Sequence, residues 1–379
     1  MQSASIRYVT VNIRSEVIVV GAGPAGIVAA IAAQKRGKQV IVLDARKPPI
    51  DKPCGEGILP QGVAALKALG ISIPAEVAFQ FRGIRFVDEK HSVGAYFADK
   101  IGLSVRRVKL HQLLVDHAMD AGVDFRWGTR VTQIDNREVS TPLGRYSYDW
   151  LIGADGQNSQ IRKWAGLDPR SAPKKRFGFC THFSLEPWSD VAEVHWTHGC
   201  QIFITPMRGH EVGVAVISRD SQLRFDKAIK QFPFLSEKLC GVKPTTRELG
   251  DTTTLRILPA VTSGRVALIG DASGTVDALT GHGLSLSFQQ AISLGESLEQ
   301  NDLASYESAH KGIAALAITM TRLMMLMSES DWIRRRTLRL FQLTPSLFTR
   351  MLAIHTGTVP LSSVSMAEIA DFSWKFLRA

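Results

Sequence analysis

The chain of 379 residues is 45% hydrophobic and 21% charged, the composition of an ordinary globular protein that is long enough for two domains. No nucleic-acid-binding motif accompanies its formal net charge of +10, so nucleic acid is not an expected partner. Four scattered cysteines without metal-ligand spacing indicate neither a disulfide framework nor a metal site.

The first motif is a glycine-rich turn. It follows a short apolar strand, Val17–Val20, and precedes a helix, Ile27–Gln34. Gly21 permits the turn, Gly23 lets the backbone approach a pyrophosphate, and Gly26 lets the helix pack closely on the strand. The free N–H groups at the helix N-terminus attract phosphate. This pattern predicts a dinucleotide-binding unit.

A second strand and a loop come next. The strand, Gln39–Leu43, ends at Asp44, whose carboxylate we expect to bind a ribose. In the following segment, Lys52–Pro60, the prolines and glycines argue against regular structure, so we expect a loop. Cys54 and Glu56 lie in this loop.

Three later elements bring further polar groups to the same place. Arg107 begins a helix with one apolar face. The apolar strand Trp150–Ala154 leads to Asp155, and the strand Arg265–Ile269 leads to Asp271. An aspartate at the carboxyl end of a strand stands where sheets of this kind bind ligands. A surface salt bridge for Arg107 and a turn-capping role for Asp271 are the structural alternatives.

The long helix Leu284–Leu298 starts directly behind Gly281-His-Gly283. The N-terminus of such a helix stabilises negative charge on a bound group. Between Ser171 and Leu258 the pattern changes to short β-branched and aromatic runs, which predict a mainly antiparallel sheet. These runs are Phe177–Leu185, Val191–Trp196, Gln201–Thr205 and Glu211–Ile217.

The C-terminal region is basic and apolar. No acidic residue occurs from Trp332 to Ser365, where arginines alternate with large apolar residues. Helices of this pattern either lie in a membrane interface or pack on the domain, and we favour packing. The apolar stretch Ile313–Met327 is short and carries Arg322, so we do not expect it to span a bilayer. Met1–Glu16 has no signal-peptide pattern, so we expect a cytoplasmic protein with peripheral membrane contact as the open alternative.

In this order the motifs resemble the single-component FAD-dependent aromatic hydroxylases and their relatives, the geranylgeranyl reductases and the flavin-dependent halogenases. The resemblance covers roughly residues 15–300 and implies FAD as cofactor and NADPH or NADH as reductant. The loop Lys52–Pro60 resembles the CG-x-G loop of the reductases and the GE-x-x-x-P loop of the halogenases. Ala278 stands where the hydroxylases usually have proline, which favours the reductase branch.

We therefore predict an α/β fold. It comprises a Rossmann-type FAD-binding domain with three layers around a mainly parallel sheet, a substrate domain with a mainly antiparallel β-sheet, and a C-terminal helical region. The expected boundaries are 1–75, 100–170 and 258–300 for the FAD-binding domain, 76–99 and 171–257 for the substrate domain, and 301–379 for the helical region.

The candidate site residues fall into three groups, and no metal ligand is expected. The candidate catalytic residues are Cys54, Glu56 and His282. A second group is expected to bind the cofactor: Gly21, Gly23, Pro24, Ala25, Gly26, Asp44, Cys54, Gly55, Arg107, Asp155, Gly156, Gly270, Asp271, Gly281, His282 and Gly283. By the resemblance, the antiparallel sheet roofs the substrate pocket, with Phe179, His182, Trp196, Phe203 and Pro206 as lining residues.

The leading hypothesis for function is an NAD(P)H-dependent FAD monooxygenase that hydroxylates or epoxidises an apolar aromatic, polyketide- or prenyl-type substrate with O₂. A reductase that saturates isoprenoid double bonds is the alternative, and a flavin-binding protein without turnover is a third. Halogenation is disfavoured because the chain lacks Trp-x-Trp-x-x-Pro and has no lysine in Phe79–Ile84.

Overall fold

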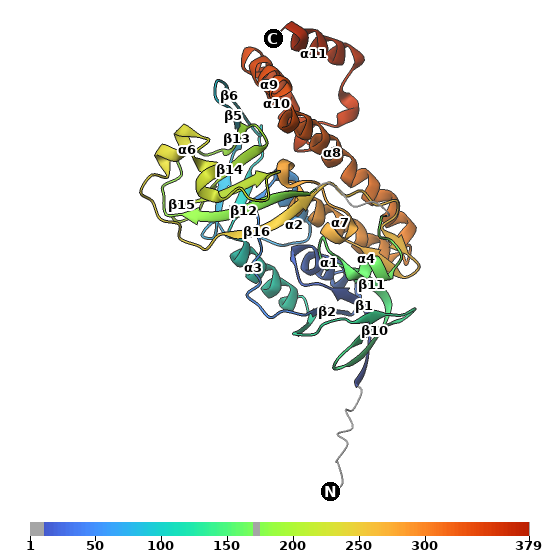
Figure 1. The fold of residues 1–379 in the computed structure, drawn as a ribbon. Helices are drawn as coiled ribbons and strands as arrows, with labels where there is room; N and C mark the ends of the chain where they lie inside the picture. The colour runs from blue at the N-terminus through green and yellow to red at the C-terminus, as the bar shows by residue number, and fades with distance from the viewer. Residues whose placement is uncertain (1–10, 170–174, 379) are drawn as a thin grey trace.

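The computed structural model describes residues 11–169 and 175–378 (Figure 1). Its largest sheet has the strand order β17-β18-β11-β1-β2-β8, with β10 paired to β11 and β9 paired to β10. The pairs joining β18, β11, β1, β2 and β8 are all parallel. The strands are β1 (Val11–Val20), β2 (Val40–Asp44), β8 (Asp124–Trp127), β9 (Gln133–Ile134), β10 (Glu138–Thr141), β11 (Gly144–Gly153), β17 (Thr262–Ser263) and β18 (Val266–Leu268).

Helices cover this parallel sheet because its crossover connections need them. They are α1 (Pro24–Gln34), α2 (Pro60–Ala68), α3 (Arg107–Asp120), α4 (Gln160–Trp164) and α7 (Gly283–Glu299). From Gly26 to Ala33 every residue of α1 is buried. Gly295 of α7 faces Ala32 of α1 with no room for a side chain, so the two helices pack closely. Two short 3₁₀ turns, η1 (Gly270–Ser273) and η2 (Ala278–Thr280), lead from the sheet into α7.

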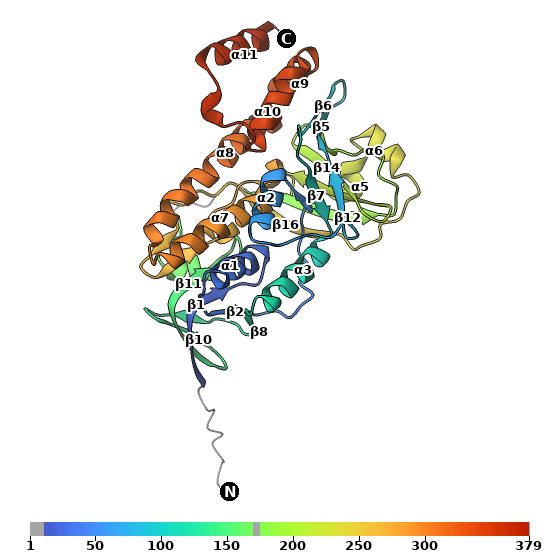
Figure 2. The ribbon, with the colours of Figure 1, turned by 180° about the vertical axis from the view of Figure 1, so that it is seen from behind.

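The second sheet has the order β16-β12-β15-β14-β13-β5-β6 and is antiparallel except for the pair β13 and β5 (Figure 2). Its strands are β5 (Gly83–Val87), β6 (Ser92–Tyr96), β12 (Lys175–Phe183), β13 (Ala192–Thr197), β14 (Cys200–Met207), β15 (Glu211–Ser218) and β16 (Leu249–Thr254). Two short helices, α5 (Phe225–Ile229) and α6 (Pro233–Lys238), pack against this sheet through an apolar cluster. The fold class expected from the sequence is confirmed.

A small third sheet connects the two large ones. It consists of β3 (Gly57–Ile58), β7 (Gly102–Val105) and β4 (Ala78–Phe81). The prediction that residues 52–60 form an irregular loop throughout is wrong at its end. Gly57 pairs with Ser104 in β3, and Pro60 begins α2, because a proline in the first helical turn needs no N–H partner. The domain boundaries stay a prediction, and the one between 170 and 171 lies outside the described residues.

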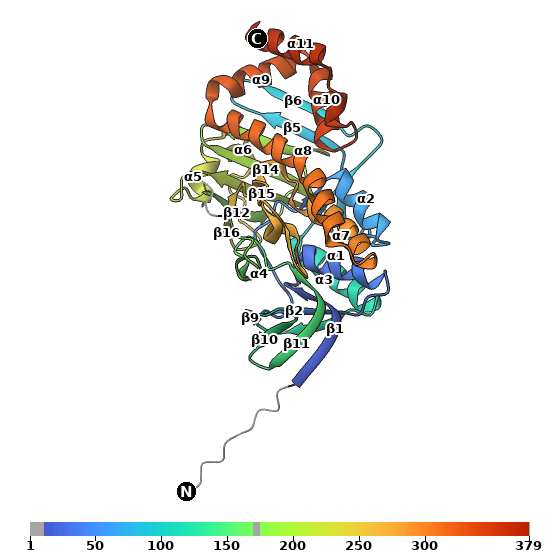
Figure 3. The same cartoon turned by 90° about the vertical axis from the view of Figure 1, so that its right-hand side faces the viewer.

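The C-terminal helices are α8 (Leu303–Glu329), α9 (Asp331–Leu343), α10 (Pro345–His355) and α11 (Met366–Arg378), with a short turn η3 (Leu361–Ser363) before α11. Helices α9 and α10 pack on β6, and with α11 they form the end of the molecule opposite strand β1 (Figure 3). By length and composition alone, α8 could cross a membrane. In the fold it packs along α7, and Met320, Met324 and Met327 on its inner side are buried.

Candidate active site

The glycine turn is built around close backbone contacts and one open position. Gly21 has a φ of +108°, and a Cβ there would stand 2.4 Å from the carbonyl oxygen of Ala154. A Cβ on Gly26 would meet the Gly21 carbonyl at 1.9 Å. At Gly23, in contrast, no atom of the described residues lies within 4 Å of the Cβ position. The turn therefore leaves room at Gly23 for a group that approaches the N-terminus of α1, as a pyrophosphate would.

Asp44 lies at the carboxyl end of β2 and is buried. Its carboxylate accepts a hydrogen bond from the backbone N–H of Ala22 at 2.8 Å and another from that of Arg46 at 2.8 Å. These contacts fix its position on the wall of a large cavity. The geometry suits a carboxylate whose remaining lone pairs accept from a ribose diol.

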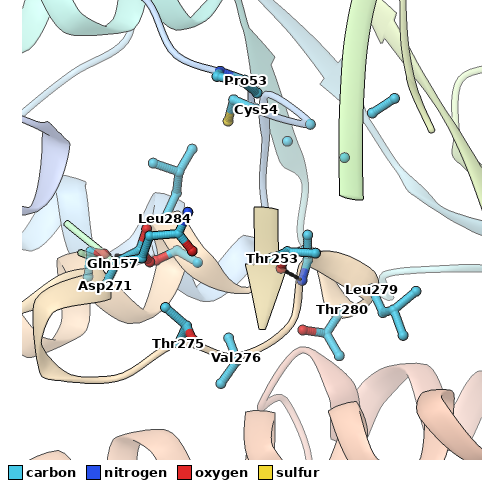
Figure 4. Close-up of a pocket in the computed structure, with 18 of the residues that line it drawn as sticks. Pro53, Cys54, Gln157, Thr253, Asp271, Thr275, Val276, Leu279, Thr280 and Leu284 are labelled. Carbon is cyan, nitrogen blue, oxygen red and sulfur yellow. Dashed lines mark hydrogen bonds between the residues drawn. The ribbon is translucent and has the colours of Figure 1, made fainter. Parts of the chain in front are cut away.

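This cavity has a volume of about 940 Å³ and runs from the glycine turn to the C-terminal helices. Asp271 faces it from η1 (Figure 4). The carboxylate is open to the cavity yet lies deep in the protein, and this desolvation raises its pKa. Arg107 is buried beside Cys54 and Glu56 on another wall of the cavity, and its terminal nitrogen Nη1 has no hydrogen-bond partner among the described residues. A buried cation with an unused donor indicates a missing polar ligand.

The remaining predicted cofactor residues differ in how they meet the cavity. Pro24, Ala25, Gly55, Gly156, Gly281 and Gly283 line the cavity. Asp155 also borders the cavity, but its carboxylate caps α4, where it accepts from Ser159 Oγ and the N–H groups of Gln160 and Ile161. Gly270 has a φ of +61° and lies against Ala25, so it lets η1 approach the glycine turn.

The loop that contains Cys54, residues 52–56, forms the wall of the cavity opposite Asp271. The Cys54 thiol points into it, above Leu284 and Thr280 (Figure 4). Burial, and secondly the nearby Glu56 carboxylate, raise the pKa of Cys54 to about 12, so the thiol keeps its proton at neutral pH. Its sulfur accepts a hydrogen bond from the Glu56 N–H at 3.2 Å.

Glu56 is the centre of a buried hydrogen-bonded chain. Its Oε1 accepts from the N–H of Arg107 at 2.6 Å, and its Oε2 accepts from His182 Nε2 at 2.6 Å. The other ring nitrogen of His182 lies 3.0 Å from Oγ1 of Thr246, which is half-buried. The chain thus leads from the cavity wall at Glu56 to the protein surface at Thr246. A solvent-facing role for Glu56 does not fit this burial.

His282 does not face the cavity. It is buried, and its Nε2 donates to the carbonyl oxygen of His355 in α10 at 2.9 Å. The two imidazole rings meet edge to face with centroids 4.3 Å apart. Burial lowers the pKa of His282 to about 4. The side chain therefore joins α7 to α10, and the placement of His282 among catalytic or cofactor-contacting side chains finds no support in this geometry.

Of the five sheet residues expected to line the pocket, only two do so. Phe179 and Phe203 face the cavity. Trp196 is fully buried and packs edge to face on Phe86, while His182 is engaged by Glu56. Pro206 lies outside the cavity, where its carbonyl oxygen accepts from Ser104. The spacing of residues along a strand shows that they alternate between its two faces. It does not show which of the two faces meets the ligand.

Sequence reasoning missed the apolar end of the cavity. The C-terminal helices supply most of it: Met320, Leu323, Met324, Leu326, Met327, Ile333, Phe341, Phe348, Met351, Leu352, Phe372 and Phe376. Ile84, Phe86 and Val194 of the antiparallel sheet complete this chamber. The signal in the sequence was the dense methionine and phenylalanine content of these helices, which we read only as packing or membrane contact.

Fold and site together define a dinucleotide-binding flavoprotein. The open space at Gly23, the unpartnered Arg107 nitrogen and the exposed Asp271 carboxylate fit the pyrophosphate and the polar chain of FAD. The family model described as "FAD binding domain" matches residues 14–301. The chain belongs to this family of FAD-binding oxidoreductases.

Known relatives include both reductases and monooxygenases. Menaquinone reductase of Mycobacterium tuberculosis is 28% identical over 328 residues, which cover 78% of this chain and 79% of the relative. Digeranylgeranylglycerophospholipid reductase 2 of Methanosphaera stadtmanae is 26% identical, with 75% and 77% covered. A 12-dehydrotetracycline 5-monooxygenase/anhydrotetracycline 6-monooxygenase of Streptomyces rimosus is 26% identical, with 84% and 71% covered. A solved flavoprotein/dehydrogenase from Cytophaga hutchinsonii has the same fold, with a TM-score of 0.79, 19% identity, and 90% and 93% covered.

Proposed function

We propose that this protein is an FAD-dependent reductase that saturates carbon–carbon double bonds of an apolar, prenyl-type substrate. The observation that carries the proposal is the continuity of the cavity. Its cofactor end, at Gly23 and Asp271, runs without interruption into a chamber of methionine and phenylalanine side chains. Flexible methionines adapt to an irregular hydrocarbon chain, and the chamber excludes water.

Saturation of a double bond requires a hydride on one carbon and a proton on the other. Bound FAD would supply the hydride chemistry, with electrons that we assign to NADPH or NADH. The Cys54 thiol, which faces the cavity, is positioned to give the proton. The Glu56 carboxylate lies close enough to this thiol to raise its pKa, and it leads through His182 to Thr246. We assign the return of the proton from solvent to this chain.

The two relatives whose names contain "reductase" support this choice, because one name denotes a geranylgeranyl lipid as the substrate. From the sequence alone, oxygenation was the leading hypothesis. We reverse this order because the thiol and the buried chain serve proton delivery to carbon. Oxygenation of an apolar substrate with NAD(P)H and O₂ remains the second candidate, because the Streptomyces monooxygenase matches over 84% of this chain.

Product mass separates the two reactions. The purified flavoprotein is incubated with NADPH or NADH and a geranylgeranyl phospholipid, with and without oxygen. We expect a gain of two hydrogens per saturated bond without oxygen, and loss of most activity in Cys54→Ala with FAD retained. A gain of one oxygen atom, dependent on O₂ and unaffected by Cys54→Ala, would instead support the monooxygenase.

A further inference from the structure

The C-terminal end of the molecule exposes an unusual amount of apolar surface. We define the α8/α11 face by six exposed side chains of α8, α9 and α11: Leu323, Leu326, Trp332, Ile369, Trp374 and Leu377. Their exposed fractions lie between 42% and 64%. Contiguous apolar surface of this kind marks a site of interaction with a protein or a membrane.

Contacts between the helices show that the face is continuous. The rings of Trp332 in α9 and Phe376 in α11 meet edge to face with centroids 5.5 Å apart. Arg336 in α9 donates to the carbonyl oxygens of Phe376 and Leu377. A single residue, Ser330, separates α8 from α9, and Figures 1 and 3 place α11 beside α9. The end of α8 and the end of α11 therefore share one side of the molecule.

Positive charge accompanies the apolar side chains. The guanidinium of Arg378 stacks over Trp374 at 3.8 Å, and that of Arg336 over Trp332 at 5.1 Å. Arg322 is exposed next to Leu323. Tryptophan rings and basic groups side by side suit the headgroup layer of an anionic bilayer, where the ring lies at the apolar boundary and the cation contacts phosphate.

The same face also reaches the cavity. Leu323 and Leu326 are exposed and line the cavity as well, together with Phe372 and Phe376 of α11. None of the described residues of α11 is buried, so this helix is held mainly through its contacts with α9 and the ion pair of Arg350 and Glu368. We therefore take the edge between α8 and α11 as the opening through which a hydrocarbon chain enters the chamber.

We infer that the α8/α11 face docks on an anionic phospholipid bilayer and takes the apolar substrate directly from it. The charge and the cavity opening favour a bilayer over a second protein chain, since neither feature is needed for protein docking. The entry route rests on the proposed function. Docking itself does not, because vesicle binding requires no turnover.

Vesicle sedimentation of the full-length flavoprotein tests this inference. We expect binding to vesicles of phosphatidylcholine with phosphatidylglycerol, weaker binding to phosphatidylcholine alone, and weakening by salt. The double substitution Trp374→Glu, Leu377→Glu should raise the lipid concentration for half-saturation about tenfold or more, because two apolar contacts are lost. Leu143→Glu is the matched control, because Leu143 is 67% exposed but lies in the turn between β10 and β11.

Three outcomes would overturn the inference. The first is no binding of the wild type to anionic vesicles, and the second is equal sedimentation of the double variant and the wild type. The third is a dimer in size-exclusion chromatography that the double substitution dissociates, which would make the face a protein interface. Circular dichroism and FAD absorbance of each variant verify folding, and retained product formation from detergent-dispersed substrate would separate lost docking from lost chemistry.

Discussion

At the scale of single residues, the Glu56 carboxylate is hydrogen-bonded at both of its oxygens. It is buried between the N–H of Arg107 and the ring of His182, with hydrogen bonds of 2.6 Å to each. Its backbone adopts a φ of +59°, a left-handed conformation that non-glycine residues rarely take. Such local strain persists where the surroundings hold it in place, and here the two hydrogen bonds do so.

Removing the His182 ring, which is hydrogen-bonded to Glu56, should slow proton delivery. We expect His182→Ala to lower the rate of product formation about 10²-fold, because general acid–base groups contribute factors of this size. Added imidazole should restore part of the rate of product formation. The restored rate should change with pH around the pKa of imidazole. His195→Ala, which removes another buried histidine of this sheet, one paired with Glu193, is the control. A loss of rate that imidazole leaves unchanged would mean that His182 only supports the structure.

At the scale of elements, the junction of α7 and α10 depends on two buried histidines. His282 donates to the carbonyl oxygen of His355, and burial lowers the pKa of His282 from 6.5 to about 4. Burial, and secondly the charge of the neighbouring His282 imidazole, lower the pKa of His355 as well. This contact holds the start of α7, which faces the cofactor end of the cavity, against the helices of the apolar end.

The junction predicts an acid-sensitive stability. Because the folded pKa of His282 lies below the unfolded value, its contribution is complete above pH 6.5 and is lost as the pH falls towards about 4. Within this window the slope is at most about 1.4 kcal/mol per pH unit for this group. In His282→Gln, the amide can still donate to His355. The free energy of unfolding, measured with urea at several pH values between 4 and 7, should depend less steeply on pH in this variant than in the wild type. An identical slope would contradict the predicted pKa.

At the scale of the whole molecule, the cofactor site joins parts of the chain that are far apart. The glycine turn, Asp155 and Asp271 follow β1, β11 and β18 in the chain, and these three strands are neighbours in one parallel sheet. A ligand that contacts all three loops binds only the folded chain. FAD should therefore stabilise the fold, by about 2.7 kcal/mol at a hundredfold excess over its Kd.

Thermal unfolding with and without FAD tests this coupling. Gly23→Val should leave the apoprotein nearly as stable as the wild type, because no atom lies within 4 Å of the Cβ position, but it should abolish the rise of Tm with FAD. Gly312→Val in α8, whose Cβ position is also free, is the matched control and should keep the rise. If Gly23→Val retained bound FAD, the glycine turn would not be the pyrophosphate site.

The sequence alone determined the cofactor end of the site. The glycine turn, Asp44 and Asp271 were predictable because each follows a buried strand within a few residues, and parallel strands bring their carboxyl ends to one edge. The antiparallel sheet was predictable for a similar reason, since hairpin neighbours in sequence are neighbours in space. Local spacing is sufficient wherever the geometry of one element sets the position of the residue.

Only the tertiary structure decided the substrate end. Glu56 and His182 are 126 residues apart, and His282 and His355 are 73 apart, so no local pattern relates them. The apolar C-terminal helices presented the same difficulty, because a stripe of large apolar residues fits a core, a membrane or a cavity wall equally well. Which of these it becomes depends on the neighbouring surfaces, and those surfaces exist only after β5, β13 and α7 have been assembled.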